Sequence, residues 1–365
     1  MKKKICWITA DSFIDVDLPI IDKLPSRFKV DWIIVLSKTL RINYNELIER
    51  TDKALTPRVL KLSYRARDLR VIMQYYQLSR MIRSTKADIV YIDCPGIPYF
   101  LPLLRLFVNR YNTVIAIHNV KTPKGANNPW LSKLYISVVM RLYLNIHVFS
   151  QNQYEYLNQH WNRKNVLLAP LALKDFGKPN DKRTKEVITF LNFGIIRDYK
   201  RIDVLIEAAQ LVYDELKIVF KILIVGDCNN WGRYERLIKY PFLFQTHIRS
   251  IPNSEVADFF AQSHYFVLPY QDIAQSGALT VALNYNLPII ASDLPSFREV
   301  ITHGIDGYLF KVGSVVELAK VLKHTLLNHN NEYDKLRLAQ RNYVAKNLST
   351  SSIVERYSSF FDSLS

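Results

Sequence analysis

The chain has 365 residues, of which 49% are apolar, and it carries a formal net charge of +16 at pH 7. This length exceeds the usual size of one domain, so we expect two, each with a sizeable core. Cys6, Cys94 and Cys228 lie far apart and match no metal-ligand spacing, which argues against structural zinc and for a reduced, cytosolic protein. No run reaches the roughly 18 uninterrupted apolar residues of a membrane span, so we expect none.

Charge and glycine are unevenly distributed along the chain. Residues 1–174 hold 27 Lys and Arg against 12 Asp and Glu, net +15, and residues 175–365 hold 22 against 21, net +1. This asymmetry predicts that the first half faces an anionic partner. Eight of the ten glycines lie in the second half. Because phosphate-binding turns favour glycine, we expect nucleotide binding there.

The first half alternates short apolar runs with helical or polar stretches. The pattern predicts strands at 4–9, 30–36, 89–92, 113–117 and 146–150, and helices at 57–85, 129–144 and 152–160. Seven Lys and Arg make the 57–85 stretch a basic amphipathic helix. Such a helix can be an ordinary solvated face or a surface for anionic lipid, and the charge of the whole half favours the lipid. Nucleic acid is a rival anion, but no recognition motif for it is present.

The second half repeats the alternation after a polar linker at 173–185. It predicts strands at 187–192, 219–225, 265–268 and 288–292, and helices at 202–215, 254–263, 277–284 and 315–327. The fold class is therefore α/β, with two doubly wound parallel sheets covered on both faces. Tandem domains of this kind bind ligands at the carboxyl ends of their strands, in the cleft between them. The candidates by this rule are Asp11, Asp93, His118, Gly194, Arg197 and Gly226.

Two segments of the second half supply what a diphosphate needs. Residues 193–200, FGIIRDYK, give a glycine turn followed by the cations Arg197 and Lys200. Residues 275–278, QSGA, give a turn of small residues with free backbone N–H groups that opens a helix. Together they predict a protein that binds a nucleoside diphosphate.

These residues resemble the donor-diphosphate motif of retaining GT-B glycosyltransferases of family 4. Further similar runs follow in that family's order, namely IVGD at 224–227, FVLPY at 266–270, PIIASD at 288–293, EVI at 299–301 and GIDGY at 304–308. The resemblance is specific over residues 187–365 and generic over 1–174. It implies a GT-B fold with an acceptor domain at 1–174, a nucleotide-sugar domain at 175–345, and a helix at 346–365 that crosses back onto the first domain.

The resemblance also assigns roles to residues. Arg197 and Lys200 would stabilise the leaving diphosphate, and His118 would lie near the donor sugar. The remaining donor-binding candidates are Gly194, Gly226, Asp227, Ile251, Pro252, Gln275, Ser276, Gly277 and Glu299. Asp11 and Asp93 would bind the acceptor, although both could instead cap helices. No cofactor and no metal are implied, because the two cations and the helix N-terminus would neutralise the diphosphate.

One departure from the family concerns two glutamates eight positions apart, which here are Ile273 and Val281. Neither side chain can hydrogen-bond a ribose or a sugar. The main hypothesis is a glycosyltransferase that moves a sugar, with retention, from a nucleoside diphosphate sugar to a saccharide acceptor, either free or lipid-linked. It would be cytoplasmic and peripherally bound to the inner, anionic face of the membrane. The alternatives are a catalytically silent nucleotide-sugar-binding protein of the same fold and a sugar-nucleotide epimerase.

Overall fold

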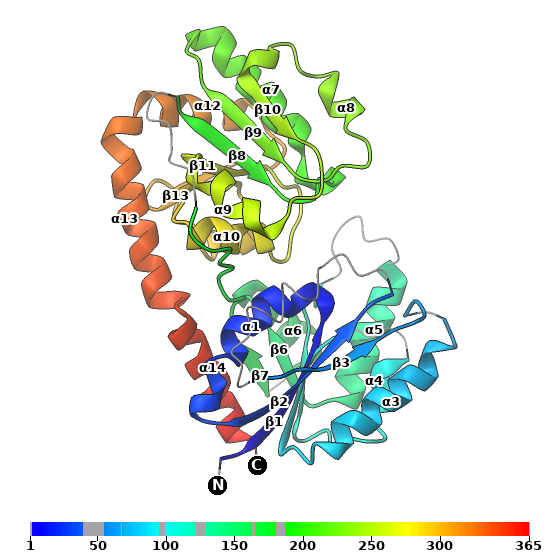
Figure 1. Cartoon of the computed structure of the whole chain (residues 1–365). Coiled ribbons are helices and arrows are strands. Elements are labelled where there is room, and N and C mark those ends of the chain that lie inside the picture. Colours follow the sequence, from blue (N-terminus) through cyan, green and yellow to red (C-terminus); the bar gives the residue numbers. More distant parts are fainter. Residues whose placement is uncertain are drawn as a thin grey trace. The chain divides into compact units, whose positions relative to one another are not determined.

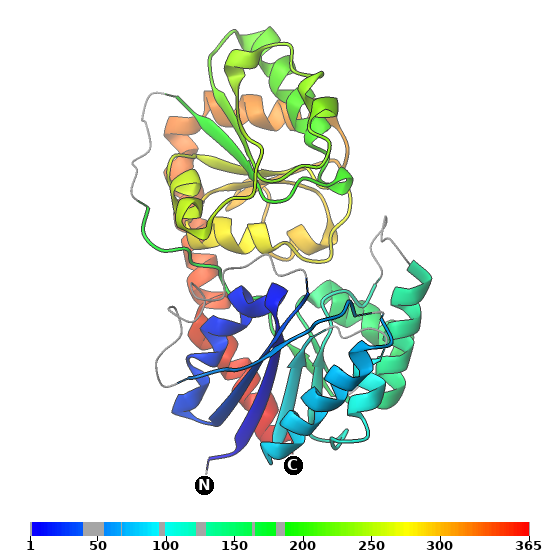
Figure 2. The same cartoon turned by 45° about the vertical axis from the view of Figure 1, so that its right-hand side comes forward.

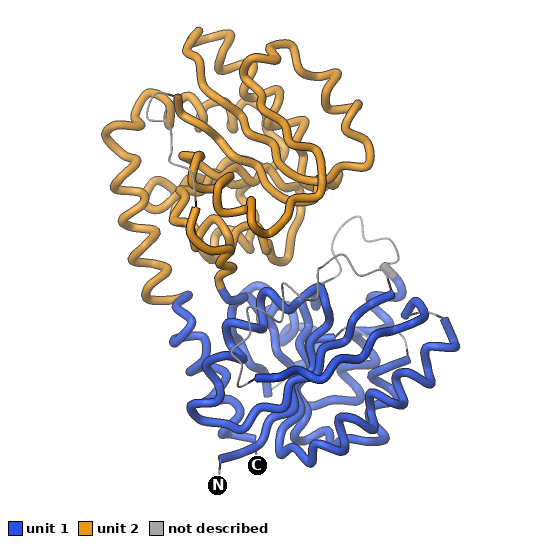
Figure 3. The backbone as a smooth tube through the Cα atoms, in the orientation of Figure 1, with its two compact units in different colours: residues 1–172, 348–365 blue, residues 173–347 orange. Residues whose placement is uncertain are grey.

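The computed structural model divides the chain into two compact units (Figure 3), residues 1–172 with 348–365 and residues 173–347. It describes residues 2–38, 55–66, 68–94, 99–121, 129–162, 165–179 and 187–364. Part of the predicted linker, from Asn180 onward, and the predicted basic residue Arg67 lie outside the described residues. Each unit is an α/β unit built on its own parallel sheet (Figure 1), which confirms the predicted fold class.

Unit 1 contains a seven-stranded sheet, counted over its described residues, in the order β3-β2-β1-β4-β5-β6-β7. Its strands are β1 Lys4–Ala10, β2 Lys29–Leu36, β3 Arg58–Lys61, β4 Ile89–Asp93, β5 Thr113–Ala116, β6 Asn145–Val148 and β7 Val166–Leu168. Its helices are α1 Ile14–Ile21, α3 Val71–Ser84, α4 Phe100–Leu104, α5 Pro129–Leu142, α6 Gln151–Trp161 and α14 Thr350–Ser363, with the 3-10 turns Asp11–Phe13 and Leu24–Ser26.

The central strand β1 shows why both faces of this sheet are apolar. Side chains alternate along a strand, and Cys6 and Ile8 enter one core while Ile5 and Trp7 enter the other. The first core is completed by helices α3 to α6, and the second by α1 and α14. The two layers are visible on opposite faces of the sheet (Figure 2). A strand buried on both sides therefore appears in the sequence as a continuous apolar run.

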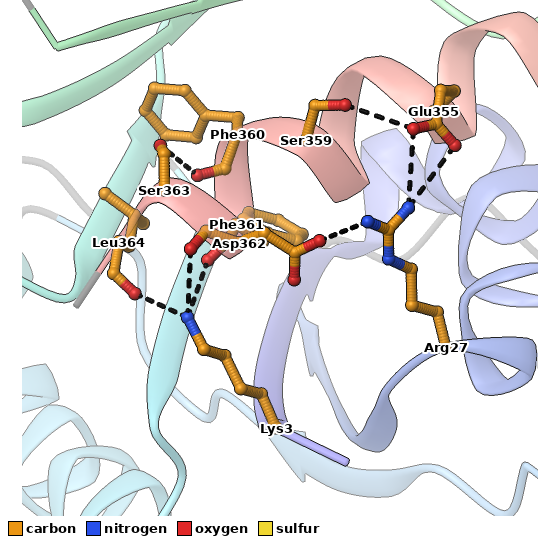
Figure 4. Close-up of polar contacts among 9 residues, drawn as sticks. All are labelled: Lys3, Arg27, Glu355, Ser359, Phe360, Phe361, Asp362, Ser363 and Leu364. Carbon is orange, nitrogen blue, oxygen red and sulfur yellow. Dashed lines mark hydrogen bonds and ion pairs between the residues drawn. The ribbon is translucent and has the colours of Figure 1, made fainter.

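The final helix, α14, packs on unit 1 beside α1 and β7. Its Tyr357 and Phe361 are buried against the rings of Trp7 and Tyr91. Figure 4 shows the polar contacts at its end, where Lys3 Nζ donates to the last carbonyls of the helix, at 2.8 Å for Leu364. Lys3 thus satisfies carbonyls that have no intrahelical partner and places a cation at the negative end of the helix dipole. Arg27 adds ion pairs to Glu355 and Asp362 of the same helix.

The predicted basic helix at 57–85 is wrong over its first part. Residues Arg58–Lys61 form β3, which pairs in parallel with β2, and the helix α3 begins only at Val71. Strand pairing satisfies the backbone of the β3 residues along the edge of β2. This tertiary contact outweighs the helical spacing of the apolar residues, which carried the prediction.

Unit 2 contains a six-stranded sheet, counted over its described residues, in the order β10-β9-β8-β11-β12-β13. Its strands are β8 Thr189–Phe193, β9 Lys221–Val225, β10 Phe244–His247, β11 Tyr265–Leu268, β12 Ile289–Ser292 and β13 Gly307–Phe310. Its helices are α7 Ile202–Leu216, α8 Gly232–Glu235, α9 Asn253–Ala261, α10 Gly277–Asn284, α11 Pro295–Arg298, α12 Val315–Leu327 and α13 His329–Asn347, with the 3-10 turns Asp198–Lys200 and Pro241–Leu243. Helices α7 and α12 pack together on one face, and α9 and α10 lie on the other (Figure 2).

Candidate functional site

In unit 2, the turns after β8 and β9 touch each other through two glycines. Gly194 has a φ of +103° and donates its N–H to the carbonyl of Val225 at 2.8 Å. Gly226 has a φ of +142°, and a Cβ there would lie 2.4 Å from the carbonyl oxygen of Gly194. Because the clash is with backbone, only glycine fits this position without a shift of the chain. The two predicted glycines therefore hold the ends of β8 and β9 in close register.

Lys200 ends the short 3-10 turn that follows Gly194. Its side chain is only 6% exposed, and a Cβ on Gly194 would lie 3.1 Å from its Nζ. Burial first, and the neighbouring Arg197 second, lower the pKa of Lys200 to about 8. Within the described part of the chain no carboxylate pairs with it, and its Nζ lies over the ring of Tyr270, 5.4 Å from the centroid. A buried ammonium of this kind is unfavourable unless an anion joins it.

Arg197 precedes the same turn and points differently. It is the N-terminal flanking residue of the 3-10 turn, in extended conformation, and it is exposed. Its charge reaches Lys200 closely enough to disfavour the protonated lysine. The structure therefore brings the two predicted cations together, with Arg197 exposed to solvent and Lys200 buried.

The amino terminus of α10 lies next to this pair through Tyr270. Tyr270 is buried, its ring lies 5.4 Å from Nζ of Lys200, and its hydroxyl is close enough to the Ser276 side chain for that side chain to influence its pKa. Ser276 caps α10 by accepting from the N–H of Leu279 at 3.2 Å. The side-chain amide of Gln275 is buried at both its oxygen and its nitrogen, with no hydrogen-bond partner among the described residues. Orphaned buried polar atoms cost free energy, so this amide is suited to a ligand.

A residue that the sequence did not suggest completes this region. A Cβ on Gly277 would lie 3.6 Å from Nζ of Lys174, so the Lys174 ammonium reaches the amino terminus of α10. Tyr285, just past the other end of α10, binds the same segment through its hydroxyl, which contacts the N–H of Phe176 and the carbonyl of Gly177, each at 3.0 Å. The beginning of unit 2 thus runs along α10. The Lys174 ammonium therefore adds positive charge at the amino terminus of α10.

The other predicted donor residues of unit 2 occupy neighbouring loops. Asp227 follows β9 and accepts the N–H of Ile196 with its backbone carbonyl, at 2.8 Å. Ile251 and Pro252 precede α9, and Pro252 is its N-terminal flanking residue. Glu299 follows α11, and its carbonyl accepts the hydroxyl of Tyr343 at 2.9 Å. These two contacts involve the backbone carbonyls of Asp227 and Glu299, and a donor-binding role for their side chains stays a prediction.

In unit 1, the structure pairs two predicted residues. Nε2 of His118 lies 2.8 Å from a carboxylate oxygen of Asp93, at the ends of β5 and β4. The His118 ring is stacked between Phe13, at 3.9 Å and 8°, and Phe149, at 4.3 Å and 20°. Asp93 is 1% exposed, so this geometry favours a positioning role toward His118 over direct contact with an acceptor.

Asp17 and His147, which the sequence analysis did not single out, are buried near this pair. Asp17 accepts from Trp7 Nε1 at 2.9 Å and from Thr9 Oγ1 at 2.7 Å. Burial, followed by the charge of Asp93, raises the pKa of Asp17 well above its usual range, which favours a protonated carboxyl. Burial lowers the pKa of His147 to about 3, so this histidine is neutral at pH 7, with its ring nitrogens bound to Tyr91 and to a carbonyl.

Asp11 links two loops of unit 1. One of its carboxylate oxygens accepts from both the N–H and the hydroxyl of Ser37, at 2.9 and 2.5 Å. This contact ties the turn after β1 to the turn after β2. One carboxylate oxygen of Asp11 therefore has a structural role, and a contact between Asp11 and the acceptor stays a prediction.

Several features of the described residues bear on chemistry without defining a site. Ile273 and Val281, at the positions of the absent glutamates, are apolar residues, and Val281 is buried in α10. No group of three His, Cys, Asp or Glu in the described ranges is arranged to hold a metal ion. Every helix in the described part of the chain is too short or too polar to span a bilayer.

The comparisons with known proteins agree with this geometry. Residues 187–328, which hold the glycine turns, Lys200 and α10, match the family model of the glycosyl transferases group 1. The TarM protein of S. aureus, solved with fondaparinux, α-GlcNAc-glycerol and UDP, has a TM-score of 0.74 at 14% identity, over 99% of this chain and 100% of that chain. The chain has the GT-B fold.

Two further GT-B structures align over nearly their whole length. HepE of Anabaena, solved with UDP and glucose, has a TM-score of 0.73 at 13% identity and covers 99% of this chain and 100% of that one. Sucrose-phosphate synthase of Thermosynechococcus elongatus has a TM-score of 0.74 at 13% identity, over 100% and 99%. A search of curated proteins finds no match. The family model and the fold together support a GT-B glycosyltransferase.

Proposed function

We propose that the protein transfers a sugar from a nucleoside diphosphate sugar to a saccharide acceptor, with retention of configuration. The observation that carries the proposal is Lys200, which is buried next to Arg197 and has no carboxylate partner within the described part of the chain. A buried ammonium without a carboxylate partner costs free energy, and a bound anion would relieve that cost. A diphosphate is the leaving group that would occupy such a site.

The residues of unit 2 would have separate roles in this reaction. Lys200 and Arg197 would neutralise the diphosphate as the bond between the anomeric carbon and the β-phosphate oxygen breaks. The N–H groups at Ser276 and Gly277, together with Lys174, would hold the other phosphate oxygens. The bond that forms joins the acceptor oxygen to the anomeric carbon. The proton of the acceptor hydroxyl would pass to the leaving phosphate, so that no separate carboxylate base is required.

The unit 1 dyad would act on the sugar. With Asp93 accepting from Nε2, His118 presents its Nδ1 edge, and the two aromatic rings prevent it from turning. A fixed imidazole of this kind is suited to a hydrogen bond with a sugar hydroxyl. We further propose that transfer needs no metal, since Lys200, Arg197 and the amino terminus of α10 would neutralise the diphosphate. The acceptor is proposed to be lipid-linked, in keeping with the basic unit 1.

Nucleotide binding by the purified protein tests the proposal first. We expect UDP, GDP or ADP to bind, and UDP is the first choice because S. aureus TarM and Anabaena HepE were solved with it. Binding should be lost in Lys200→Ala and kept in Lys178→Ala, which changes an exposed lysine of the same unit. Absence of binding for all three nucleotides would overturn the donor site.

Turnover then separates the enzyme from its alternatives. Release of the nucleoside diphosphate only when an acceptor is added indicates transfer. Binding without turnover over a broad set of acceptors would indicate the catalytically silent protein. This alternative is tested because Ile273 and Val281 stand where the family has two glutamates. Conversion of the sugar nucleotide with no acceptor present would indicate an epimerase.

A further inference from the structure

The outer face of α3 in unit 1 exposes apolar side chains that nothing in the described structure covers. Met73 of α3 is 65% exposed, Leu69 in the turn just before the helix is 68% exposed, and Ile72 and Tyr76 of α3 are also exposed. Arg80 and Arg83 continue the same stripe toward the end of the helix. Residues spaced by three and four lie on one side of a helix, so the stripe is apolar in its first half and cationic in its second.

The turn that follows the neighbouring helix α4 extends this face. Helices α3 and α4 lie side by side on the sheet (Figures 1 and 2). The Tyr76 ring of α3 meets the ring of Phe107, in the turn after α4, edge-on at 5.5 Å between centroids. Leu106 of the same turn is 77% exposed. Farther along, Arg83 and Lys86 line a shared groove with Phe107. Helix α3 and the turn after α4 therefore present one continuous surface, which we call the α3–α4 face.

This face is almost free of negative charge. The sequence has no Asp or Glu between Asp68 and Asp88, and none from residue 94 to residue 154. Both flanking carboxylates are already bound, since Asp68 pairs with Arg70 at 2.7 Å and Asp88 accepts the N–H of Lys4 at 2.7 Å. The potential of the face is therefore set by its arginines and lysines.

We propose that the α3–α4 face docks on an anionic lipid surface. Leu69, Met73 and Leu106 would enter the acyl boundary, while Arg80 and Arg83 would contact acidic headgroups. A second copy of this face would bring like charges together. A nucleic acid would use the cations and leave the apolar side chains without a partner. The proposal does not rest on the transfer reaction, although it places a lipid-linked acceptor beside unit 1 if that reaction is confirmed.

Vesicle sedimentation tests the proposal with the full chain. We expect binding to phosphatidylcholine vesicles that contain roughly one third phosphatidylglycerol, weak binding to pure phosphatidylcholine, and loss of binding as salt is raised. The doubly charge-reversed variant, Arg80→Glu with Arg83→Glu, should bind at least about tenfold more weakly. The apolar variant, Leu69→Ser with Met73→Ser, should also bind several-fold more weakly, because it removes the inserted side chains.

A matched control lies on α13 of unit 2. There Leu338 is 57% exposed and Lys335 and Arg341 are exposed, but Asp334 is interspersed among them. Lys335→Glu with Arg341→Glu, and Leu338→Ser, should leave vesicle binding unchanged. All these positions are exposed, and far-UV circular dichroism with UDP binding reports that each variant is folded and has an intact donor site.

Three outcomes would overturn the proposal. The first is no preference for the anionic vesicles, and the second is an equal loss in the α13 control. The third is a loss in the arginine variant with none in the apolar variant, which would indicate a soluble polyanion or an acidic protein as partner. Vesicle binding without nucleotide binding would leave the α3–α4 face supported and the proposed function refuted.

Discussion

The two units have the same architecture, but two buried ionisable groups of unit 1 and one of unit 2 differ in whether they have partners. In unit 1, the buried His147 is neutral and both its ring nitrogens are bound, and Asp17 accepts two hydrogen bonds. In unit 2, Lys200 is almost fully buried, keeps a pKa of about 8, and has no carboxylate partner among the described residues. Satisfied buried groups stabilise a fold, whereas an unsatisfied cation that stays protonated at neutral pH indicates a place for an anion.

The largest expected effect tests that contrast directly. Lys200→Ala should lower transfer by at least about a hundredfold, because it removes the charge closest to the leaving group. Lys200→Met should do the same while raising the stability of the nucleotide-free protein at pH 7. A pKa held at about 8 instead of 10.5 corresponds to about 3 kcal/mol of unfavourable burial. Release of the nucleoside diphosphate measures transfer, and urea unfolding of the nucleotide-free protein measures stability. A folded Lys200→Ala with normal turnover would refute the role of Lys200.

The next effect concerns the glycine turns that place Lys200. Gly226→Ala should destabilise unit 2 by about 2 to 4 kcal/mol, because its Cβ meets backbone and the residue has a positive φ. Gly232→Ala is the control, since a Cβ there meets nothing within 4 Å. Urea denaturation compares the two variants. Equal stabilities would show that the β8 and β9 turns can separate without cost.

A third prediction addresses unit 1. Asp93→Asn should leave nucleotide binding intact and lower turnover by about ten- to a hundredfold, because His118 loses the partner that orients it. The loss should fall on kcat, with the KM for the donor unchanged, an effect that a purely structural role would not produce. Asp31→Asn, which removes a partner of Lys4 at 3.0 Å, is the control. An unchanged kcat in Asp93→Asn would reduce the dyad to a structural contact.

A smaller effect is expected from the residue that extends the site beyond its predicted members. Lys174→Ala should weaken binding of the nucleoside diphosphate by about tenfold, the effect of one charged hydrogen bond. Lys178→Ala, four residues farther along, should have none. Binding of the nucleoside alone should not distinguish the two variants. If nucleoside diphosphate binding is equal in both, Lys174 lies outside the phosphate site.

The pH dependence gives the smallest expected effect. Because binding needs protonated Lys200, affinity for the diphosphate should fall several-fold as pH rises above about 8. The stability of the folded protein depends on pH in the opposite direction. The folded pKa lies below the unfolded one, so the penalty for burying the charge is full below pH 8 and is relieved as pH rises toward 10.5. Titration calorimetry from pH 7 to 9.5 measures the affinity, and an affinity that stays constant over this range would show that binding does not depend on the charge of Lys200.

The sequence by itself determined the fold class and the positions of the main phosphate-binding candidates. Buried parallel strands leave continuous apolar runs, and the strands Tyr265–Leu268 and the helix Val315–Leu327 lie where those runs predicted them. The glycine turn and the two cations of 193–200 are local in sequence, and so is the cap at Ser276. Such features are readable because their residues are neighbours along the chain.

Only the tertiary structure decided which charges are buried and which residues meet from distant segments. Lys174 and Gly277 are 103 positions apart, Asp93 ends β4 whereas His118 follows β5, and residues 58–61 form a strand because β2 offers an edge. Burial of Lys200 likewise depends on Tyr270 and the glycine turns packed around it. Desolvation and hydrogen-bond pairing are properties of the packed surroundings, and no local pattern of residues encodes them.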